Sequence, residues 1–428
     1  MDENIYIGLA NVLRHGTIYA DQAGIQVPFL TWNGEHLVAF FPLGMPLLIA
    51  GVSYWNWQAM FLINAVAILI GFFLFARWLR ADGLHPWYAW LYLYYPTVLF
   101  YSRTVMADVL CMVTIFASCW YFRQGRYSLA GLLAGFAPHT KITGVLLLPT
   151  LFAAGAARTD RVVVLRKFLL GAFPGLALLF LHNAATTGHF WASPYLLPAG
   201  QETLSFVYCR TNFMLFSQSL FFLYPFMPLF LCAGWKRFQL PAVFTVLFLL
   251  FHLCVPTSWI TGNQWGNWPQ RLVLQIRYLL PVIPFFLLMY ADGLDRLSKG
   301  RTARWLPLAL VPLLISAGLI HSKHQEYLRE LRSFQKVLYE TVPRQADLFV
   351  NYDTLHLMND IQGKRPWTLV SDAKLLPLPP EGKLVFYSEL VQRYGNRPTK
   401  KSPVPMRLIT RVEGKLASLS IYRLSREL

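Results

Sequence analysis

Charged side chains that interrupt long apolar runs are the residues of this sequence best placed to do chemistry. A charge inside a membrane segment is costly and is usually functional. A carboxylate can accept a proton from a hydroxyl group, and a cation can stabilise negative charge that develops on a leaving phosphate. The acidic candidates are Asp2, Glu3 and Asp108. The basic candidates are Arg103, His139, Lys141, Arg210, Arg271 and Arg277.

The acidic pair at the start of the chain opens an amphipathic helix. Its apolar face holds Ile5, Leu9, Val12 and Leu13 at helical spacing, and Gly16 is expected to end it. We interpret the pair as the reactive centre, which the apolar remainder of the chain presents at a membrane surface. The alternative is helix capping, because acidic residues suit the first turn of a helix.

The other charged candidates carry alternatives of their own. Arg103 and Asp108 could close a tight turn between helices, or Asp108 could face the same cavity as Asp2. Lys141 could snorkel to the interface or contact a phosphate as a compact charge. A lone histidine at a membrane edge, such as His139, is more often structural.

The loop that precedes Arg277 adds aromatic and amide side chains. Trp265 and Arg271 lie in this loop, and Arg277 and Tyr278 begin the next apolar run. Tryptophans beside amides suit stacking on sugar rings, but they also form the aromatic belt of membrane proteins, which we favour for the tryptophans alone. Arg277 is the sharper signal, because an arginine one turn inside a span needs an anionic partner.

The composition predicts a helical protein that crosses a membrane several times. Hydrophobic residues make up 55% of the 428 residues and charged residues only 14%, whereas soluble proteins carry about 25% charged residues. The mean hydropathy is +0.41. We expect a juxtamembrane helix at residues 37–47 and about ten spans of membrane-crossing length. These spans are expected at 56–78, 86–102, 104–123, 127–139, 142–156, 165–186, 214–233, 240–260, 273–292 and 305–321.

Loop charges set the expected orientation. When the spans alternate, the basic loops fall on one side, which the positive-inside rule assigns to the cytoplasm. The candidate residues then map to the outer face of a plasma (inner) membrane. The N-terminus would also lie outside with no span before it, so we expect that an upstream first helix is missing from this chain.

Net charge and cysteines exclude other classes of protein. The net charge of +17 is carried mainly by short loops, so it indicates anionic lipid headgroups and not nucleic acid. The five cysteines contain no CxxC pair, so neither a disulfide framework nor a zinc site is predicted.

Residues 322–428 change in character. A helical pattern runs over 324–340 and is followed by short strand-like runs. We expect a small extracytoplasmic α/β domain here, and a transmembrane domain over 1–321 whose residues 1–55 form the catalytic loop and juxtamembrane helices. The expected strands include residues 348–350, 384–387 and 419–422.

An ordered series of motifs runs through the transmembrane part. The first is an Asp-Glu helix motif that is matched, apart from small spacing differences, by Asp2, Glu3, Tyr6, Ala10, Leu13, Gly16 and Tyr19. The later ones are the turn that contains Tyr101, Ser102, Arg103 and Asp108, then Lys141, then the stretch Arg277-Tyr278-Leu279-Leu280-Pro281. The series resembles the membrane glycosyltransferases of the GT-C fold. Within them it most resembles the bacterial relatives of dolichyl-phosphate-mannose protein mannosyltransferases (glycosyltransferase family 39) and the aminoarabinose transferases that act on lipid A.

This resemblance implies an inverting transfer of a sugar from a polyprenyl-phosphate donor to a lipid, glycan or protein of the cell envelope. By position it implies Asp2 as the catalytic base, Asp108 as a supporting acidic residue, and Lys141 and Arg277 as phosphate contacts. Glu3 would assist the base, or would bind a divalent cation as in some members. The remaining substrate-binding candidates are Arg103, His139, Trp265, Arg271 and Tyr278.

Two other functions would use the same groups. A transporter or flippase for lipid-linked sugars needs the basic, aromatic cavity but no base. The chain shows no internal repeat of the kind many transporters have, and the C-terminal domain would be unexplained. A ligase or polymerase of lipid-linked glycans would depend on a large external loop with arginines, whereas the longest loop, 187–213, holds only Arg210.

Overall fold

The structure of the chain is a computed structural model. It describes residues 2–23, 27, 30–33, 35–39, 41–192, 205–223, 237–255, 277–298, 302–351, 354, 357, 367–369, 383–392, 404–415 and 417–424. These residues fall into two compact units, which are described separately. The helical unit contains the described residues of 30–257 and 269–320, and the sheet unit contains those of 1–29 and 321–428.

Apolar helices dominate the helical unit, as the composition predicts. Four helices within the described residues are long and apolar enough to cross a membrane, namely Trp57–Ala81, Arg161–Thr187, Arg277–Arg296 and Leu306–Thr341. Shorter apolar helices of this unit are Gly44–Ser53, Ile142–Ala156 and Gln239–Cys254. The helical membrane architecture is therefore confirmed, whereas the expected number of ten spans is not.

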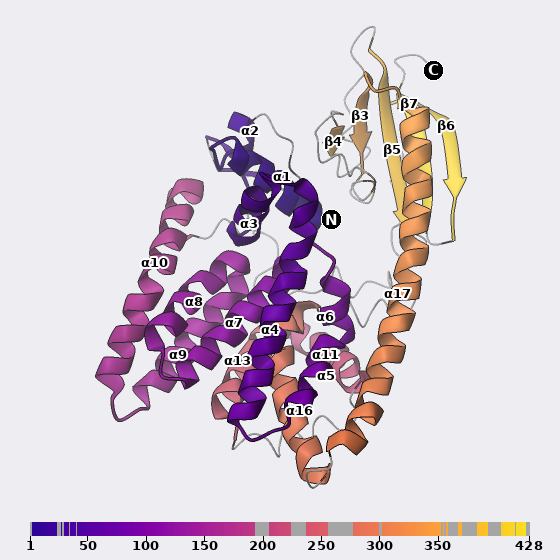
Figure 1. The fold of residues 1–428 in the computed structure, drawn as a ribbon. Helices are drawn as coiled ribbons and strands as arrows, with labels where there is room; N and C mark the ends of the chain where they lie inside the picture. Colours follow the sequence, from indigo (N-terminus) through magenta and orange to yellow (C-terminus); the bar gives the residue numbers. More distant parts are fainter. Residues whose placement is uncertain are drawn as a thin grey trace. The chain divides into compact units, whose positions relative to one another are not determined.

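The order of elements in the helical unit can be followed by colour in Figure 1. A short hairpin of β1 (Leu30–Trp32) and β2 (Leu37–Ala39) precedes the helices. The first helices are α3 (Gly44–Ser53), η1 (Trp57–Phe61), α4 (Leu62–Ala81), η2 (Pro86–Tyr88), α5 (Ala89–Leu93), α6 (Pro96–Tyr101), α7 (Ala107–Arg123) and α8 (Tyr127–Thr140). The later ones are η3 (Ile142–Leu146), α9 (Leu147–Ala156), α10 (Arg161–Thr187), η5 (Phe206–Tyr208), α11 (Cys209–Leu223), α13 (Gln239–Cys254), η6 (Arg277–Val282), α16 (Ile283–Ser298) and α17 (Thr302–Thr341).

Two segments differ from their expected structure. Residues 86–102 do not form one span, because Pro96 starts a new helix and its ring nitrogen has no hydrogen to continue the preceding one. Residues 37–47 do not form one juxtamembrane helix either. Leu37–Ala39 pairs as a strand with β1, and the helix begins only at Gly44.

Glycines allow α8 and α10 to touch through their backbones. A Cβ atom on Gly135 would lie 2.4 Å from the Ala172 carbonyl oxygen, and one on Gly175 would lie 2.3 Å from the Gly135 carbonyl carbon. Gly131 and Gly171 extend the contact, since a Cβ atom added to either would lie 2.0 Å from a carbonyl oxygen of the other helix. The pairs 131/135 and 171/175 therefore form a small-xxx-small interface, a common solution in membrane helices.

A buried aromatic cluster joins four other helices of this unit. Trp78 of α4 lies 5.0 Å from Phe116 of α7, measured between ring centres, and Phe116 lies 5.5 Å from Phe285 of α16. Phe285 lies 5.6 Å from Phe244 of α13. Such tilted and edge-on pairs add to the free energy gained by burial, so the four helices are held as one body.

Ion pairs collect at one end of these helices. Asp82 follows α4 and forms two hydrogen bonds of 2.5 Å with Arg123, the last residue of α7. Asp292 of α16 is fully buried, with Arg237 at 2.5 Å and Arg296 at 2.6 Å. This basic end of the helical unit is the one that loop charges assign to the cytoplasm, an assignment that stays a prediction.

The sheet unit begins with the helix predicted for the N-terminus. Helix α1 spans Asp2–Arg14 and is followed by the short α2, Ala20–Ala23. Ile5, Leu9 and Val12 are buried, as predicted, whereas Leu13 is half-buried. Gly16 adopts a φ of +76° just after α1 ends, so the expected helix stop is confirmed.

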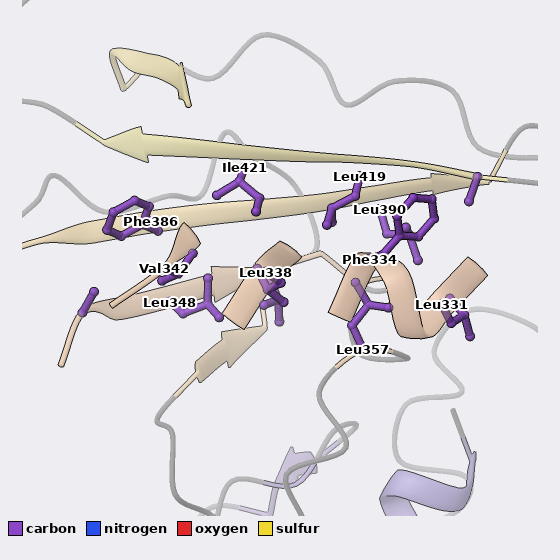
Figure 2. Packing of buried hydrophobic residues seen from close by; sticks show 13 residues of the cluster. Leu331, Phe334, Leu338, Val342, Leu348, Leu357, Phe386, Leu390, Leu419 and Ile421 are labelled. Atoms are coloured by element: carbon purple, nitrogen blue, oxygen red, sulfur yellow. The ribbon is translucent and has the colours of Figure 1, made fainter. Parts of the chain in front are cut away.

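The remainder of the sheet unit is a five-stranded sheet with the end of α17 on one face. The strand order is β4-β3-β5-β7-β6, with β3 parallel to β4 and β5 and the other pairs antiparallel. Phe334 and Leu338 of α17 pack against Leu348, Leu419 and Ile421 of the sheet (Figure 2). The bounds are β3 (Asp347–Val350), β4 (Trp367–Leu369), β5 (Val385–Gln392), β6 (Met406–Glu413) and β7 (Ala417–Leu424). The predicted small C-terminal sheet with a helix beside it is thus confirmed, whereas the predicted domain bounds stay a prediction.

Candidate functional site

Asp108 is the buried centre of the candidate site. It lies in the first turn of α7, where a carboxylate is favoured by the helix dipole, and is 3% exposed. One carboxylate oxygen, Oδ1, accepts a hydrogen bond from Lys141 Nζ. The other, Oδ2, lies 3.9 Å from Arg277 Nε. Two cations from different parts of the chain therefore converge on one carboxylate.

Tyr278 supplies an aromatic face to both cations. Lys141 Nζ lies 4.6 Å from the centre of the Tyr278 ring, and Arg277 Cζ lies 5.0 Å from it. Arg277 Nη2 also donates a 3.0 Å hydrogen bond to the Tyr278 hydroxyl. Cation–π contacts of this kind are strongest where water is excluded. We call Asp108, Lys141, Arg277 and Tyr278 the cation cluster.

The end of α8 holds Lys141 in place. Lys141 is the residue directly after α8 and has an extended backbone. His139, in the last turn, is buried, and its Nε2 bonds to the Gly175 carbonyl oxygen of α10 at 2.8 Å. A Cβ atom on Gly44 would lie 2.5 Å from the His139 carbonyl oxygen, so α3 also closes on this turn. His139 thus packs α8 against α10, and its role as a substrate contact stays a prediction.

Asn64 of α4 holds the turn that leads into Asp108. Its side chain is fully buried, and Nδ2 donates to the Thr104 and Met106 carbonyl oxygens at 2.8 and 2.9 Å. Met106 is the residue before α7. The position of the Asp108 carboxylate is therefore set by α4 as well as by its own helix.

His252 brings the end of α13 to the same site. It is 2% exposed, stacks on Phe248 with ring centres 4.1 Å apart, and lies 6.4 Å from the Tyr278 ring centre. Its Nδ1 lies 2.9 Å from the Phe248 carbonyl oxygen and donates to it. Neither His252 nor Asn64 is among the site residues predicted from the sequence, although each is a single polar residue in an apolar run.

The cation cluster and the basic end lie at opposite ends of the helical unit. Asp108 is in the first turn of α7 and Arg123 is its last residue, a separation of about 22 Å along the helix axis. Helix α13 likewise begins beside Arg237 and ends beside His252. The structure therefore separates the two sets of charges, as expected from the alternation of spans.

The other candidates are placed as follows. Arg103 is exposed in the turn between α6 and α7, and Arg210 is exposed on α11. Trp265 and Arg271 lie outside the described residues. Asp2 and Glu3 belong to α1 of the sheet unit, and their side chains also lie outside the description. Among the described residues, no group of three or more histidine, cysteine or carboxylate side chains could hold a metal ion.

Comparisons with known proteins identify the fold. No protein-family model and no curated protein matches the sequence. The structure is similar to ArnT from Cupriavidus metallidurans in the apo state, with 12% identity, a TM-score of 0.59, and coverage of 98% of this chain and 93% of that one. It is similar over the same shares to ArnT bound to undecaprenyl phosphate, with 11% identity and a TM-score of 0.54. The resemblance to aminoarabinose transferases is thus confirmed at the level of the fold, and this chain has the GT-C fold of ArnT.

Proposed function

We propose that this chain is an inverting glycosyltransferase of the plasma (inner) membrane. It moves a sugar from a polyprenyl-phosphate donor to an envelope lipid, glycan or protein on the extracytoplasmic side. The fold supports this proposal, because an ArnT of the same fold was solved with undecaprenyl phosphate bound. Membrane lipids surround the helical unit and accommodate the prenyl chain.

The observation that carries the proposal is the cation cluster. Lys141 and Arg277 are held side by side over Tyr278, at the end of apolar helices, by one carboxylate. Keeping two positive charges together at a membrane edge costs free energy. Both side chains would bind a phosphate group of the donor, whose negative charge is opposite to theirs. Lys141 offers a compact charge and Arg277 a planar fork of donors. Both stabilise the charge that develops on the phosphate as the sugar leaves.

Asp2 serves as the catalytic base in this proposal. Its carboxylate accepts the proton of the acceptor hydroxyl, whose oxygen forms a bond to the anomeric carbon as the bond from that carbon to the phosphate oxygen breaks. Attack from the face opposite the phosphate inverts the anomeric centre. Glu3 assists the base, and Asp108 orients Lys141. The support for Asp2 and Glu3 is the sequence motif they share with the resembling family.

Asp2→Asn tests the chemistry. Membranes that contain the full chain are incubated with a radiolabelled polyprenyl-phosphate sugar and envelope extract, and sugar transferred to acceptor is counted. We expect transfer to fall at least a hundredfold while binding of the lipid donor is retained, since a base contributes about 10²–10⁴-fold. Glu340→Gln, an exposed carboxylate near the end of α17 and outside residues 1–55, is the matched control. Transfer at the wild-type rate would contradict the assignment of Asp2.

The same assay separates the proposal from its alternatives. A transporter or flippase would move the intact lipid-linked sugar across the membrane, so the label would stay on the prenyl lipid. A ligase or polymerase would transfer whole glycan chains. Transfer of a single sugar with release of polyprenyl phosphate is the outcome that the proposal requires.

A further inference from the structure

Two cysteines that are distant in sequence meet at the end of the helical unit that holds the cation cluster. Cys209 is the first residue of α11 and Cys254 is the last residue of α13, and their Sγ atoms lie 3.7 Å apart. Both side chains are half-buried. By contrast, Cys111 and Cys119 are buried within α7.

The backbones around this cysteine pair are tied to each other. The Ser205 amide donates to the Cys254 carbonyl oxygen at 2.9 Å. Asn212 Nδ2 lies within 3.1 Å of the carbonyl oxygens of His252, Leu253 and Val255, the end of α13. The chain segments that carry the two cysteines are therefore held together by hydrogen bonds that do not involve the sulfurs. To bond, the sulfurs would have to approach from 3.7 Å to about 2.05 Å.

The side of the membrane that the two cysteines face decides whether their thiols are oxidised. Cys254 comes two residues after His252, whose ring lies beside Tyr278, and α13 runs from here towards Arg237 at the basic end. If the cation cluster faces the extracytoplasmic side, as the proposed function has it, both thiols are exposed to an oxidising compartment. The inference therefore rests on the orientation in the proposed function, although not on its chemistry.

We propose that Cys209 and Cys254 form a disulfide bond in the cell. A Cys thiolate attacks a disulfide of an extracytoplasmic thiol oxidase, and the second thiolate then displaces the oxidase sulfur. The chain loses two protons and two electrons as the bond between the Sγ atoms forms, and the oxidase disulfide is reduced to two thiols. The bond fixes the start of α11 to the end of α13 and so holds His252 beside the cation cluster.

The redox state of the pair in cells tests this inference. Cells that express the full chain are lysed directly in sodium dodecyl sulfate with N-ethylmaleimide, which traps every free thiol. The protein is then reduced, labelled with an isotopically heavy maleimide and analysed by peptide mass spectrometry. We expect heavy label on Cys209 and Cys254 and light label on Cys111 and Cys119. In a Cys209→Ser variant, Cys254 should carry the light label.

Light label on both Cys209 and Cys254 would overturn the proposal. Treating the purified chain with the thiol oxidant diamide would then locate the error. A disulfide that forms only with diamide places the pair in a reducing compartment and contradicts the proposed orientation. No disulfide even with diamide contradicts the geometry. Neither result depends on sugar transfer, so failure of the proposed enzyme activity would be a separate finding.

Discussion

Asn64 and Met106 are joined by a 2.9 Å hydrogen bond from the side-chain amide of one to the carbonyl oxygen of the other. Met106 precedes α7, and Asp108 is the second residue of that helix. A residue of α4 thus fixes the turn from which the central carboxylate of the cation cluster projects. The cluster is supported by a residue that does not belong to it.

Asn64→Leu should loosen this turn. The substitution keeps the approximate volume but leaves buried carbonyl groups without their donor, at a cost of about 1–3 kcal/mol. We expect amide hydrogen exchange at residues 101–106 to rise at least tenfold, with a smaller change elsewhere in α4 and α7. Ser118→Ala is the matched control, because it removes a buried 2.7 Å hydrogen bond to Ala130 from the middle of α7. Equal exchange of the turn in both variants would show that Asn64 does not hold it.

Lys141 and Asp108 should be energetically coupled. The Asp108 side chain is 4% exposed and that of Lys141 is 17% exposed, and breaking a buried pair by removing one partner costs about 3–5 kcal/mol. We expect Lys141→Met and Asp108→Asn each to lower stability to dodecyl-sulfate unfolding in mixed micelles. The double variant should lose less than the sum, by about 1–3 kcal/mol. Strict additivity would mean that Lys141 snorkels to the interface independently of Asp108.

Gly175→Ala should separate α8 from α10. The new methyl group would lie 2.3 Å from a backbone atom of Gly135, and such overpacking costs about 1–3 kcal/mol. We expect a lower midpoint of thermal unfolding in detergent. Gly318→Ala is the control, because a methyl group there meets nothing within 4 Å. A midpoint that falls equally in both variants would rule out a specific α8–α10 contact.

Arg237 and Arg296 both pair with Asp292, so losing either one alone should cost little stability. Its carboxylate is fully buried, whereas the Arg237 and Arg296 side chains are 36% and 54% exposed. Either arginine alone can still pair with the carboxylate, so we expect Arg237→Met or Arg296→Met to cost about 1 kcal/mol or less. The double variant leaves a buried charge unpaired and should cost about 3–5 kcal/mol. A double loss equal to the sum of the single losses would contradict this reading.

The charged residues of the site could be chosen from the sequence because a charge in an apolar run is conspicuous. Asp108, Lys141 and Arg277 were selected in that way, and span alternation predicted that they share one end of the helices. The contacts among them could not be predicted, since they depend on how α7, α8 and η6 pack. Asn64 and His252 were missed because a neutral polar side chain in a span costs less than a charge and stands out less.

The helices were predicted where apolar runs were long, as for α4 and for α10, which continues through Pro174. The prediction was wrong for residues 86–102, where Pro96 divides the run. In the sheet unit, the strands β3, β5 and β7 were predicted from short strand-like runs at 348–350, 384–387 and 419–422. Strand β6 was not, because it lies at the edge of the sheet and most of its side chains are exposed or half-buried. Edge strands need no apolar pattern, so sequence alone carries little signal for them.

Binding of a polyprenyl phosphate to the purified chain tests the central claim most directly. Affinity for undecaprenyl phosphate is measured in detergent for the wild type, Lys141→Met and Arg277→Met, with Lys167→Met as the control. Lys167 is exposed on α10 and its loss removes the same charge from another part of the helical unit. We predict that each cluster variant weakens binding at least tenfold, or about 1.4 kcal/mol, and that the control changes it less than twofold. Unchanged affinity in both cluster variants would contradict the claim that the cation cluster binds the donor phosphate.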